Sequence, residues 1–420
     1  MSRENARAAG AARALLRDRL ADPHTVSLFA SALELALSFA GSALVARMLL
    51  PAGRGELGRW MFWGQMAVSF CGMGIQSALP QLVGARAIAP ELALRVAGGF
   101  VVGLALFGTV VAAALTPLVP RGMVSVGWYA IALAFVPATL GALVAQGLAM
   151  ARERVVPMVL LRVGSRLVYT VAVAVLLAVG EQRTAVAAAA VAGHAILQVA
   201  LLSAVAAPQR PRGALAAIRL TLRRGLSNHV PSLLLIGMSL VDQGWVFTHL
   251  ADEDAGLYAI ALGAAMTLDV IAAAETTAST VAMSDPKTGW RRAWTALGRT
   301  AVLAGAGALL AWALAPTLIP LVYGRAFTSA MPLFRLLVAG EALYNVGRVA
   351  EAVLQSRGAP RVAWAFQGVR GVALVISMVW FGAERGAVGV ALAAGVANAV
   401  GALATLGAVL WVFRRTRSFA

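Results

Sequence analysis

The residues of this chain that could do chemistry are ionisable side chains inside long apolar stretches. They comprise six arginines (Arg47, Arg162, Arg166, Arg335, Arg348 and Arg370) and six carboxylates (Glu34, Asp242, Asp269, Glu275, Glu341 and Glu351). A charge at the centre of a bilayer costs at least about 2.5–3.5 kcal/mol on insertion scales. Residues of this kind serve ligand binding, ion coupling or pairing with one another, and these twelve define the candidate site.

Three of the arginines are placed to bind an anion. Arg162 and Arg166 are four residues apart, and residues with this spacing share one face of a helix. Arg370 lies at a similar depth in another apolar stretch, so Arg166 and Arg370 would face each other across a central cavity. Guanidinium groups bind phosphate oxygens through paired hydrogen bonds. We therefore predict that these residues, with Arg348, bind a pyrophosphate or sugar ligand.

The carboxylates suggest a second chemistry. A carboxylate in a water-poor cavity can exchange a proton or hold a cation, which makes Asp242, Asp269 and Glu275 candidates for ion coupling. Asp269 and Glu275 are six residues apart, about 240° around a helix. These two residues therefore do not form one site by themselves.

The same charges also permit a purely structural interpretation. Six positive and six negative groups can neutralise one another as ion pairs. Glu341, Arg348 and Glu351 share one helix face and are the clearest instance. Arg162 can extend its guanidinium group to the membrane surface, and Arg47 is expected to anchor structure. The sequence leaves binding and pairing open.

Twelve apolar stretches of about 20 residues position these side chains, and each is long enough to cross a ~30 Å hydrocarbon core as a helix. The expected spans are residues 27–50, 58–81, 94–116, 124–148, 156–180, 184–207, 226–250, 256–282, 299–322, 331–354, 361–383 and 387–413. The chain is 60% hydrophobic with a mean hydropathy of +0.81, too apolar for a soluble core to bury. We predict an all-α, polytopic membrane protein.

The basic residues are distributed unevenly over the expected loops. Of 35 lysines and arginines, 23 fall in the N-terminal arm, the even-numbered loops and the tail, and six in the odd-numbered loops. The positive-inside rule places both termini in the cytoplasm of a cell (inner) membrane protein. The net charge of +17 lies in loops and tails, so anionic membrane lipids, and not nucleic acid, are the expected partners.

A hydrophilic, arginine-rich break divides the chain into halves. We expect a cytoplasmic arm at 1–26, a six-helix bundle at 27–207, a basic linker at 208–225, a second six-helix bundle at 226–413 and a cytoplasmic tail at 414–420. The halves are weakly similar at an offset of about 200 residues, which places Gly55 opposite Gly256. Two bundles of equal orientation around a central cavity are the expected architecture.

Three segments share a recognisable pattern. They are Ala43 to Gly58, Gly225 through Asp242 to Tyr258, and Leu321 to Phe327 followed by Glu341 to Gln355 and Arg357 to Arg361. These segments resemble the polysaccharide-type flippases of the multidrug/oligosaccharidyl-lipid/polysaccharide (MOP) exporter superfamily. The resemblance covers nearly the whole chain, although some relatives have fourteen spans.

The resemblance implies a specific activity. A flippase of this type moves a polyprenyl-pyrophosphate-linked oligosaccharide, a precursor of cell-surface polysaccharide, from the inner to the outer leaflet by alternating access. Such a protein is needed because a sugar chain and a pyrophosphate cannot cross hydrocarbon without partners for their hydrogen bonds and charge. Glycan polymerases or glycosyltransferases of the same pathway are the implied protein partners.

Two other functions stay open. A cation-coupled multidrug exporter of the same superfamily needs a net negative cavity, whereas a flippase needs a net positive one, and equal numbers of charges do not decide between them. A polytopic glycan-processing enzyme would need sizeable outer loops, but these loops are only a few residues long. The acidic loop Asp252–Asp254 has no base beside it in the sequence.

Other chemistry is not indicated. Lys287, the only lysine, follows Pro286 and not glycine, so it does not form a Walker A phosphate loop. The single cysteine, Cys71, cannot form an intramolecular disulfide, and the four histidines are too dispersed for a metal site. We expect no enzymatic activity, no cofactor and no metal.

Overall fold

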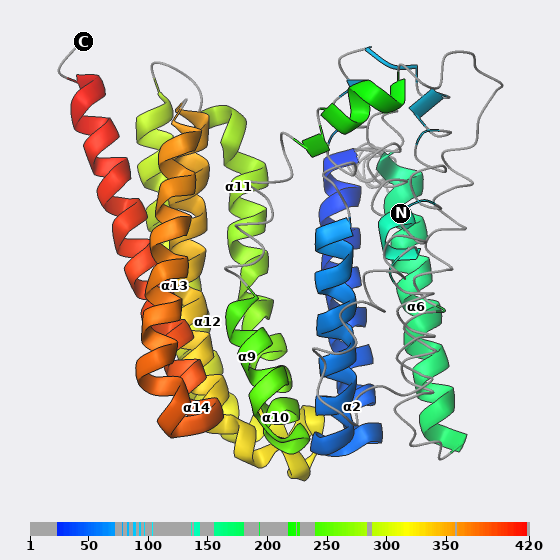
Figure 1. The fold of residues 1–420 in the computed structure, drawn as a ribbon. Coiled ribbons are helices and arrows are strands. Elements are labelled where there is room, and N and C mark those ends of the chain that lie inside the picture. The colour runs from blue at the N-terminus through cyan, green and yellow to red at the C-terminus, as the bar shows by residue number, and fades with distance from the viewer. Residues whose placement is uncertain are drawn as a thin grey trace, which may run out of the picture. The chain divides into compact units, whose positions relative to one another are not determined.

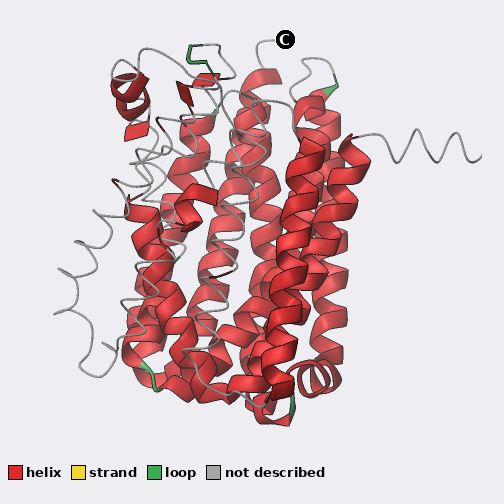
Figure 2. Cartoon of the chain, turned by 90° about the vertical axis from the view of Figure 1, so that its right-hand side faces the viewer, coloured by secondary structure: helices red, strands yellow, loops and turns green. Residues whose placement is uncertain are grey.

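The computed structural model is built from long helices (Figure 1). It describes residues 23–71, 155–179, 217–223, 225–226, 240–283, 288–357 and 359–417, together with short pieces within 78–142 and residue 193. All regular elements of these residues are helical (Figure 2), which confirms the all-α prediction. The expected spans at 94–116, 124–148 and 184–207 lie largely outside the described residues.

Six described helical segments are long and apolar enough to cross a membrane. They are Leu33–Phe70, Asp252–Thr276, Gly289–Tyr323, Arg325–Ser356, Arg361–Gly382 and Glu384–Arg415. Five of them coincide with the last five expected spans, and the first covers most of the first two. Apolar side chains on the outer faces of these helices are strongly exposed; Leu309 and Trp380, for example, are 72% and 73% exposed. The chain is therefore a multi-pass membrane protein.

The chain divides into two compact units. The N-terminal unit comprises Met1–Ser42, Phe70–Val179 and Ala188–Asn228, and the C-terminal unit comprises Ala43–Ser69, Gly180–Ala187 and His229–Ala420. Helix α2 (Pro23–Cys71) contributes to both units. The domain boundaries expected at residues 27–207 and 226–413 remain predictions, because most of residues 72–239 lie outside the description.

In the N-terminal unit, α6 (Val155–Val179) packs along the first part of α2. A methyl group added at Gly41 would lie 3.1 Å from the ring of Tyr169, so the absence of a side chain there allows a close approach. The Thr170 hydroxyl donates to the Leu37 carbonyl at 3.2 Å. This contact links α6 to α2 close to the arginines of α6.

Positive φ angles mark three turns between helices. Leu50 (φ 57°) interrupts α2 just before Pro51, Gly324 (φ 99°) ends α12 (Gly289–Tyr323), and Gly386 (φ 56°) interrupts α14 (Pro360–Arg417). Glycine adopts this conformation at no steric cost, whereas leucine does not. Gly324 and Gly386 fall in odd-numbered loops expected from the sequence, and Leu50 is the last residue of the first expected span, directly before such a loop.

The C-terminal unit is organised around α13 (Met331–Ser356). This helix packs against α10 (Asp252–Ala265), α11 (Asp269–Met283), α12 and α14. The short helices α9 (Val241–His249), η2 (Met266–Leu268) and η3 (Arg325–Ala330) complete the unit. Figure 1 shows the α9–α10 turn and the interruption of α14 at one end of this unit, away from the C-terminus.

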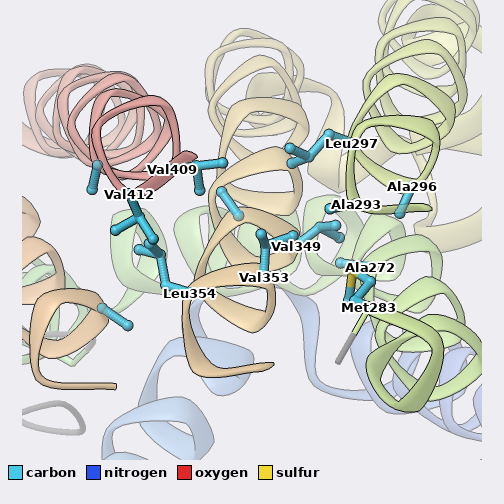
Figure 3. Close-up of a cluster of buried hydrophobic side chains, with 13 residues drawn as sticks. Ala272, Met283, Ala293, Ala296, Leu297, Val349, Val353, Leu354, Val409 and Val412 are labelled. Carbon is cyan, nitrogen blue, oxygen red and sulfur yellow. The ribbon is translucent and has the colours of Figure 1, made fainter. Parts of the chain in front are cut away.

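Small aliphatic side chains fill the core of this unit near the end opposite those turns. Ala272 and Met283 of α11, Leu297 of α12, Val353 of α13 and Val409 of α14 are at most 5% exposed and meet in one cluster (Figure 3). Trp290 and Trp294 pack against its edge. The cluster holds four membrane-spanning helices together and so positions the polar groups between them.

Candidate functional site: charged groups within the membrane-spanning helices

Two of the predicted arginines lie on α6 of the N-terminal unit, and their surroundings differ. Arg162 forms an ion pair with Glu34 of α2, with its Nη2 2.7 Å from Oε2. Arg166 has its guanidinium carbon 5.8 Å from the centre of the Tyr169 ring. Its Nε has no hydrogen-bond partner among the residues that the structure describes. The charge of Arg162 is thus neutralised locally, whereas no described carboxylate pairs with Arg166.

Arg370 on α14 is held by neutral groups. Its Nε donates to Asn398 Oδ1 at 2.8 Å, and its guanidinium carbon lies 4.4 Å from the centre of the Tyr344 ring. Gly401 makes room for the stem, because a methyl group there would lie 2.8 Å from the Arg370 Cβ. Stacking and a hydrogen bond hold the guanidinium group in a defined direction.

Arg348 on α13 is paired with an acid of another helix. Its Nη1 lies 3.2 Å from Oδ2 of Asp269, the first residue of α11. Glu351 instead accepts from Gln355 at 3.0 Å and from Gln367 of α14 at 2.7 Å. The expected pairing of Glu341, Arg348 and Glu351 along one helix face is therefore wrong. Tertiary packing brings closer partners from α11 and α14.

Asn345 connects α13 to the start of α11. Its Oδ1 accepts from the Ala272 backbone N–H at 3.1 Å, and its Nδ2 donates to the Glu341 carbonyl at 2.8 Å. The same Nδ2 lies 3.4 Å from Asp269 Oδ1. Glu341 is 7% exposed and interacts electrostatically with Asp269, and its Oε2 has no hydrogen-bond partner among the described residues.

Asp242 is 6% exposed and lies in the first turn of α9. The hydroxyl of Tyr258, itself fully buried, donates to its Oδ2 at 2.7 Å. Its Oδ1 has no hydrogen-bond partner among the described residues. Asp242 also interacts electrostatically with Arg370 and Glu341.

These contacts define a charge cluster inside the C-terminal unit, consisting of Asp242, Asp269, Glu341, Arg348 and Arg370. It brings together two of the three predicted coupling acids and two of the four predicted ligand-binding arginines. With all groups ionised it holds three negative and two positive charges, so one proton would neutralise it. Burial in membrane-spanning helices strengthens each of these interactions.

Glu275 lies in a separate network. It accepts from Arg299 Nη2 at 2.8 Å and from the Ser279 hydroxyl at 2.6 Å. This arrangement fits the expectation that Asp269 and Glu275 do not form one site. Its role in ion coupling remains a prediction, and its described contacts are those of a satisfied ion pair.

Two further arginines hold backbone groups. Arg47 donates from Nε to the Val322 carbonyl at 2.9 Å and from Nη2 to the Leu321 carbonyl, as expected of an anchor. Arg335 stacks on Trp312, with its guanidinium carbon 4.4 Å from the ring centre. Arg47 thus binds the C-terminal end of α12, and Arg335 binds its exposed flank at Trp312.

Arg59 closes the hairpin of α2 onto the α9–α10 turn. Its Nε donates to the Phe247 carbonyl at 2.7 Å and its Nη2 to the Leu250 carbonyl at 3.1 Å, while Nη1 lies 2.5 Å from Asp252 Oδ1. The acidic loop therefore does have a base beside it, supplied by the first hairpin and not by its own sequence neighbours.

A cavity of about 300 Å³ opens inside the C-terminal unit next to this hairpin. Its wall is formed by residues of α2, α9, α10 and η2, most of them apolar, with Gln65, Gln243 and the Tyr258 ring among the polar groups. Arg54 is the one charged group among the described residues that line it. The cavity therefore favours anionic or neutral ligands over cations.

The sequence reasoning missed Tyr258, Asn345 and Asn398 as site residues, and it counted Arg54 only as a loop charge. Neutral side chains in an apolar stretch carry no charge that would single them out. An amide in a membrane span is nevertheless a signal, because it needs a hydrogen-bond partner there. Tyr258 also lies within one of the family-like segments.

Comparison with solved structures identifies the fold. The lipid II flippase MurJ in an inward closed conformation matches with a TM-score of 0.75 and 13% identity, covering 91% of this chain and 86% of that chain. An inward-facing multidrug resistance MATE family transporter of the MOP superfamily matches with a TM-score of 0.70 and 16% identity, covering 92% and 95%. No family model and no curated protein sequence matches.

A third similar structure is a MOP superfamily transporter from Pyrococcus furiosus, described as having a binding pocket of reversed polarity that suggests a different function. It matches with a TM-score of 0.62 and 16% identity, covering 94% of each chain. The chain thus has the multi-pass helical fold that these solved structures share. The neighbours themselves are transporters of the MOP superfamily or a lipid II flippase, and not enzymes.

Proposed function

We propose that this protein is a flippase that moves a polyprenyl-pyrophosphate-linked oligosaccharide from the inner to the outer leaflet of the cell membrane by alternating access. The observation that carries the proposal is a division among the four predicted ligand-binding arginines. Arg162 and Arg348 are ion-paired with carboxylates. Arg166 and Arg370 contact aromatic faces and an amide oxygen.

This division matters because an anion competes poorly for an arginine that already has a carboxylate partner. Arg166 and Arg370 have no carboxylate at ion-pairing distance in the part of the chain that the structure describes, so a pyrophosphate can bind them without breaking an ion pair. They lie in different units, so each unit contributes one such arginine.

The test is translocation of a fluorescent polyprenyl-pyrophosphate oligosaccharide in proteoliposomes. We expect Arg166→Ala and Arg370→Ala each to reduce the rate at least about tenfold, since each removes a charge-assisted contact worth about 1.5–3 kcal/mol. Arg335→Ala is the matched control, because it removes an arginine of α13 that stacks on Trp312, and it should flip at the wild-type rate.

Arg370→Lys separates a binding role from a packing role, since it keeps the charge but loses the fork geometry of the guanidinium group. We expect a flipping rate between those of the wild type and Arg370→Ala. Thermal unfolding in detergent checks that each variant is folded. Wild-type rates in folded Arg166→Ala and Arg370→Ala would contradict the assigned site, and a folded wild type that flips none of several glycans would contradict the function.

A cation-coupled exporter of amphipathic drugs is the second candidate, and one observation favours it. The charge cluster has more acids than arginines, and Asp242 Oδ1 and Glu341 Oε2 are buried without a hydrogen-bond partner among the described residues. Such a cluster suits the binding of a proton or a cation. The charge of the cavity favours the flippase, because the described charged group on its wall is Arg54.

The proposed location follows from the distribution of charge. Arg291, Arg292, Arg361, Arg414 and Arg415 are exposed at the ends of α12 and α14. These ends belong to the loops and tail that the positive-inside rule assigns to the cytoplasm. Arginines there would contact the anionic headgroups of the inner leaflet.

A further inference from the structure

The cavity inside the C-terminal unit borders a long stretch of α2. Its lining residues on α2 run from Arg54 to Gln65, eleven residues or about 16 Å along a helix. Its volume of about 300 Å³ is at the small end of ligand pockets. That size suits a segment of a hydrocarbon chain better than a folded glycan.

The wall of the cavity is apolar and adaptable. The rings of Phe62 and Phe247 meet here with centroids 5.7 Å apart. Met61, Leu262 and Met266 add flexible apolar surface, and methionine in particular adjusts to irregular ligands. Arg54 excludes cationic drugs by its charge, so the ligand that fits is an apolar chain with a negative group at one end.

The charged end and the apolar wall of the cavity follow one another as the headgroup and the hydrocarbon chain of a membrane lipid do. Arg54 lies four residues beyond the turn at Leu50, at the hairpin end of the cavity. Gln65 and Met266, which also line the cavity, lie further along their helices toward the membrane centre. The turn leads directly into an odd-numbered loop, which the positive-inside rule places outside. A lipid of the outer leaflet has its headgroup and chain in this order.

The cavity has an open side. Gly263, Met266 and Gln65 are exposed, and a methyl group added at Gly263 meets no atom within 4 Å. A chain can therefore enter beside Gly263 without moving a helix. The same open space gives a direct way to block the cavity, because a large side chain at this position has room to fill it.

We propose that this cavity binds the phosphate-proximal isoprenoid segment of the translocated lipid, with the phosphate beside Arg54, once the headgroup has reached the outer leaflet. The inference rests on the proposed function and names a product-side site for it. The site is separate from Arg166 and Arg370, which do not line the cavity.

Equilibrium binding of radiolabelled polyprenyl monophosphate to the full-length protein in nanodiscs tests this site. We expect Gly263→Phe to raise the Kd at least about tenfold, because each pair of methylenes displaced from an apolar site weakens binding roughly tenfold. Gly298→Phe on α12 is the matched control and should bind like the wild type, because Gly298 is exposed, a methyl group there also meets nothing within 4 Å, and it does not line the cavity. An unchanged Kd in folded Gly263→Phe would overturn the proposal.

A second variant assigns the headgroup end. Arg54→Gln should weaken polyprenyl monophosphate severalfold and leave binding of the uncharged polyprenol unchanged. Equal weakening of both probes would overturn the placement of the phosphate beside Arg54. Displacement of the probe by phosphatidylglycerol as effectively as by unlabelled polyprenyl monophosphate would show that the cavity holds bulk lipid instead, which also overturns the proposal.

Flipping assays on the same variants separate this site from the proposed function. A wild type that binds the probe as described but flips no lipid-linked oligosaccharide contradicts the function and leaves a polyprenyl phosphate site. A wild type that flips, together with a Gly263→Phe variant that binds and flips equally well, contradicts the site alone.

Discussion

Asp242, Asp269 and Glu341 show three ways in which a carboxyl group is accommodated inside the membrane-spanning helices. Asp242 accepts from the Tyr258 hydroxyl, Asp269 pairs with Arg348, and Glu341 is buried with its Oε2 lacking a hydrogen-bond partner among the described residues. Because the cluster holds three acids and two arginines, the gain or loss of a single proton would change its net charge.

A proton-coupled cycle makes a specific prediction at this scale. Asp269→Asn leaves an amide that cannot release a proton, so transport should become insensitive to pH over a series in which the wild type responds. Asp242→Asn should likewise reduce the pH sensitivity of transport, because it replaces the carboxylate that accepts from the Tyr258 hydroxyl. Glu351→Gln is the matched control, because Glu351 pairs with two glutamines and lies outside the charge cluster.

The measurement is the transport rate in proteoliposomes across the pH series, with thermal unfolding as the fold check. Unchanged pH profiles in both asparagine variants would remove the coupling interpretation. The cluster would then be a structural network that holds α9, α11, α13 and α14 together.

Close packing of small residues sets the geometry between elements. Gly340 on α13 faces Gly395 on α14, and Gly347 faces Ala402. On each helix the two residues are seven positions apart, which is about two helical turns. The absence of side chains lets the two backbones approach closely, as small residues do in membrane helices. Gly401 lies beside this seam and accommodates Arg370, so the packing of α14 also positions the site.

Gly340→Ala should disturb this seam. The added methyl group would lie 2.9 Å from the Gly395 Cα, which is backbone and cannot move aside alone. We expect the free energy of unfolding to fall by about 1–3 kcal/mol, measured by thermal or denaturant unfolding in detergent. Gly407→Ala on α14 is the control, since its methyl group meets nothing within 4 Å. This substitution should leave the free energy of unfolding unchanged or raise it by up to about 1 kcal/mol. Equal stability of the two variants would contradict the packing argument.

The hairpin tips show a second close contact between elements. Gly55 and Gly256 fall opposite each other in the weak internal repeat, and the structure packs them together. A methyl group at Gly55 would overlap the Asp252 carbonyl, and one at Gly256 would overlap the Pro51 carbonyl. Arg59 completes the contact through two backbone carbonyls and Asp252. Two positions that the predicted repeat aligns thus form one interface within the C-terminal unit.

At the scale of the whole molecule, large apolar side chains of the described helices are left exposed to the membrane and are not buried in a core. Leu309, Trp380 and Leu403 are at least 70% exposed, whereas the buried core of the C-terminal unit consists mainly of alanine and valine. Small residues inside and large ones outside are typical of helices packed in lipid, where close backbone contact stabilises the bundle. The arginines of its loops predict the orientation of the chain in the membrane.

Cysteine labelling tests that orientation. The chain has one cysteine, so a Cys71→Ala background allows single cysteines to be introduced. We expect Arg385→Cys, beside the turn at Gly386, to react with an impermeant maleimide added to intact cells. Arg415→Cys, near the end of α14, should react only after permeabilisation. The reverse labelling pattern would show that the topology is inverted. Labelling of both cysteines from the same side would contradict a membrane crossing between residues 385 and 415.

The sequence by itself determined the class of fold and the position of the last five spans. Hydropathy over about 20 residues and the count of arginines per loop are local properties, and the bilayer converts them directly into helices and orientation. It also identified the acids and arginines of the charge cluster, because any charge in an apolar stretch stands out.

Only the tertiary structure decided which of these charges pair. Arg348 binds Asp269 across helices and not Glu341 or Glu351 on its own helix, and Arg162 binds Glu34 whereas Arg370 binds Asn398. Helix rotation and the closeness allowed by glycines such as Gly401 select each partner. The cavity beside Arg54 likewise depends on the contact of two hairpins about 200 residues apart in the chain. Such distances depend on the packing of whole helices, which no local pattern of residues encodes.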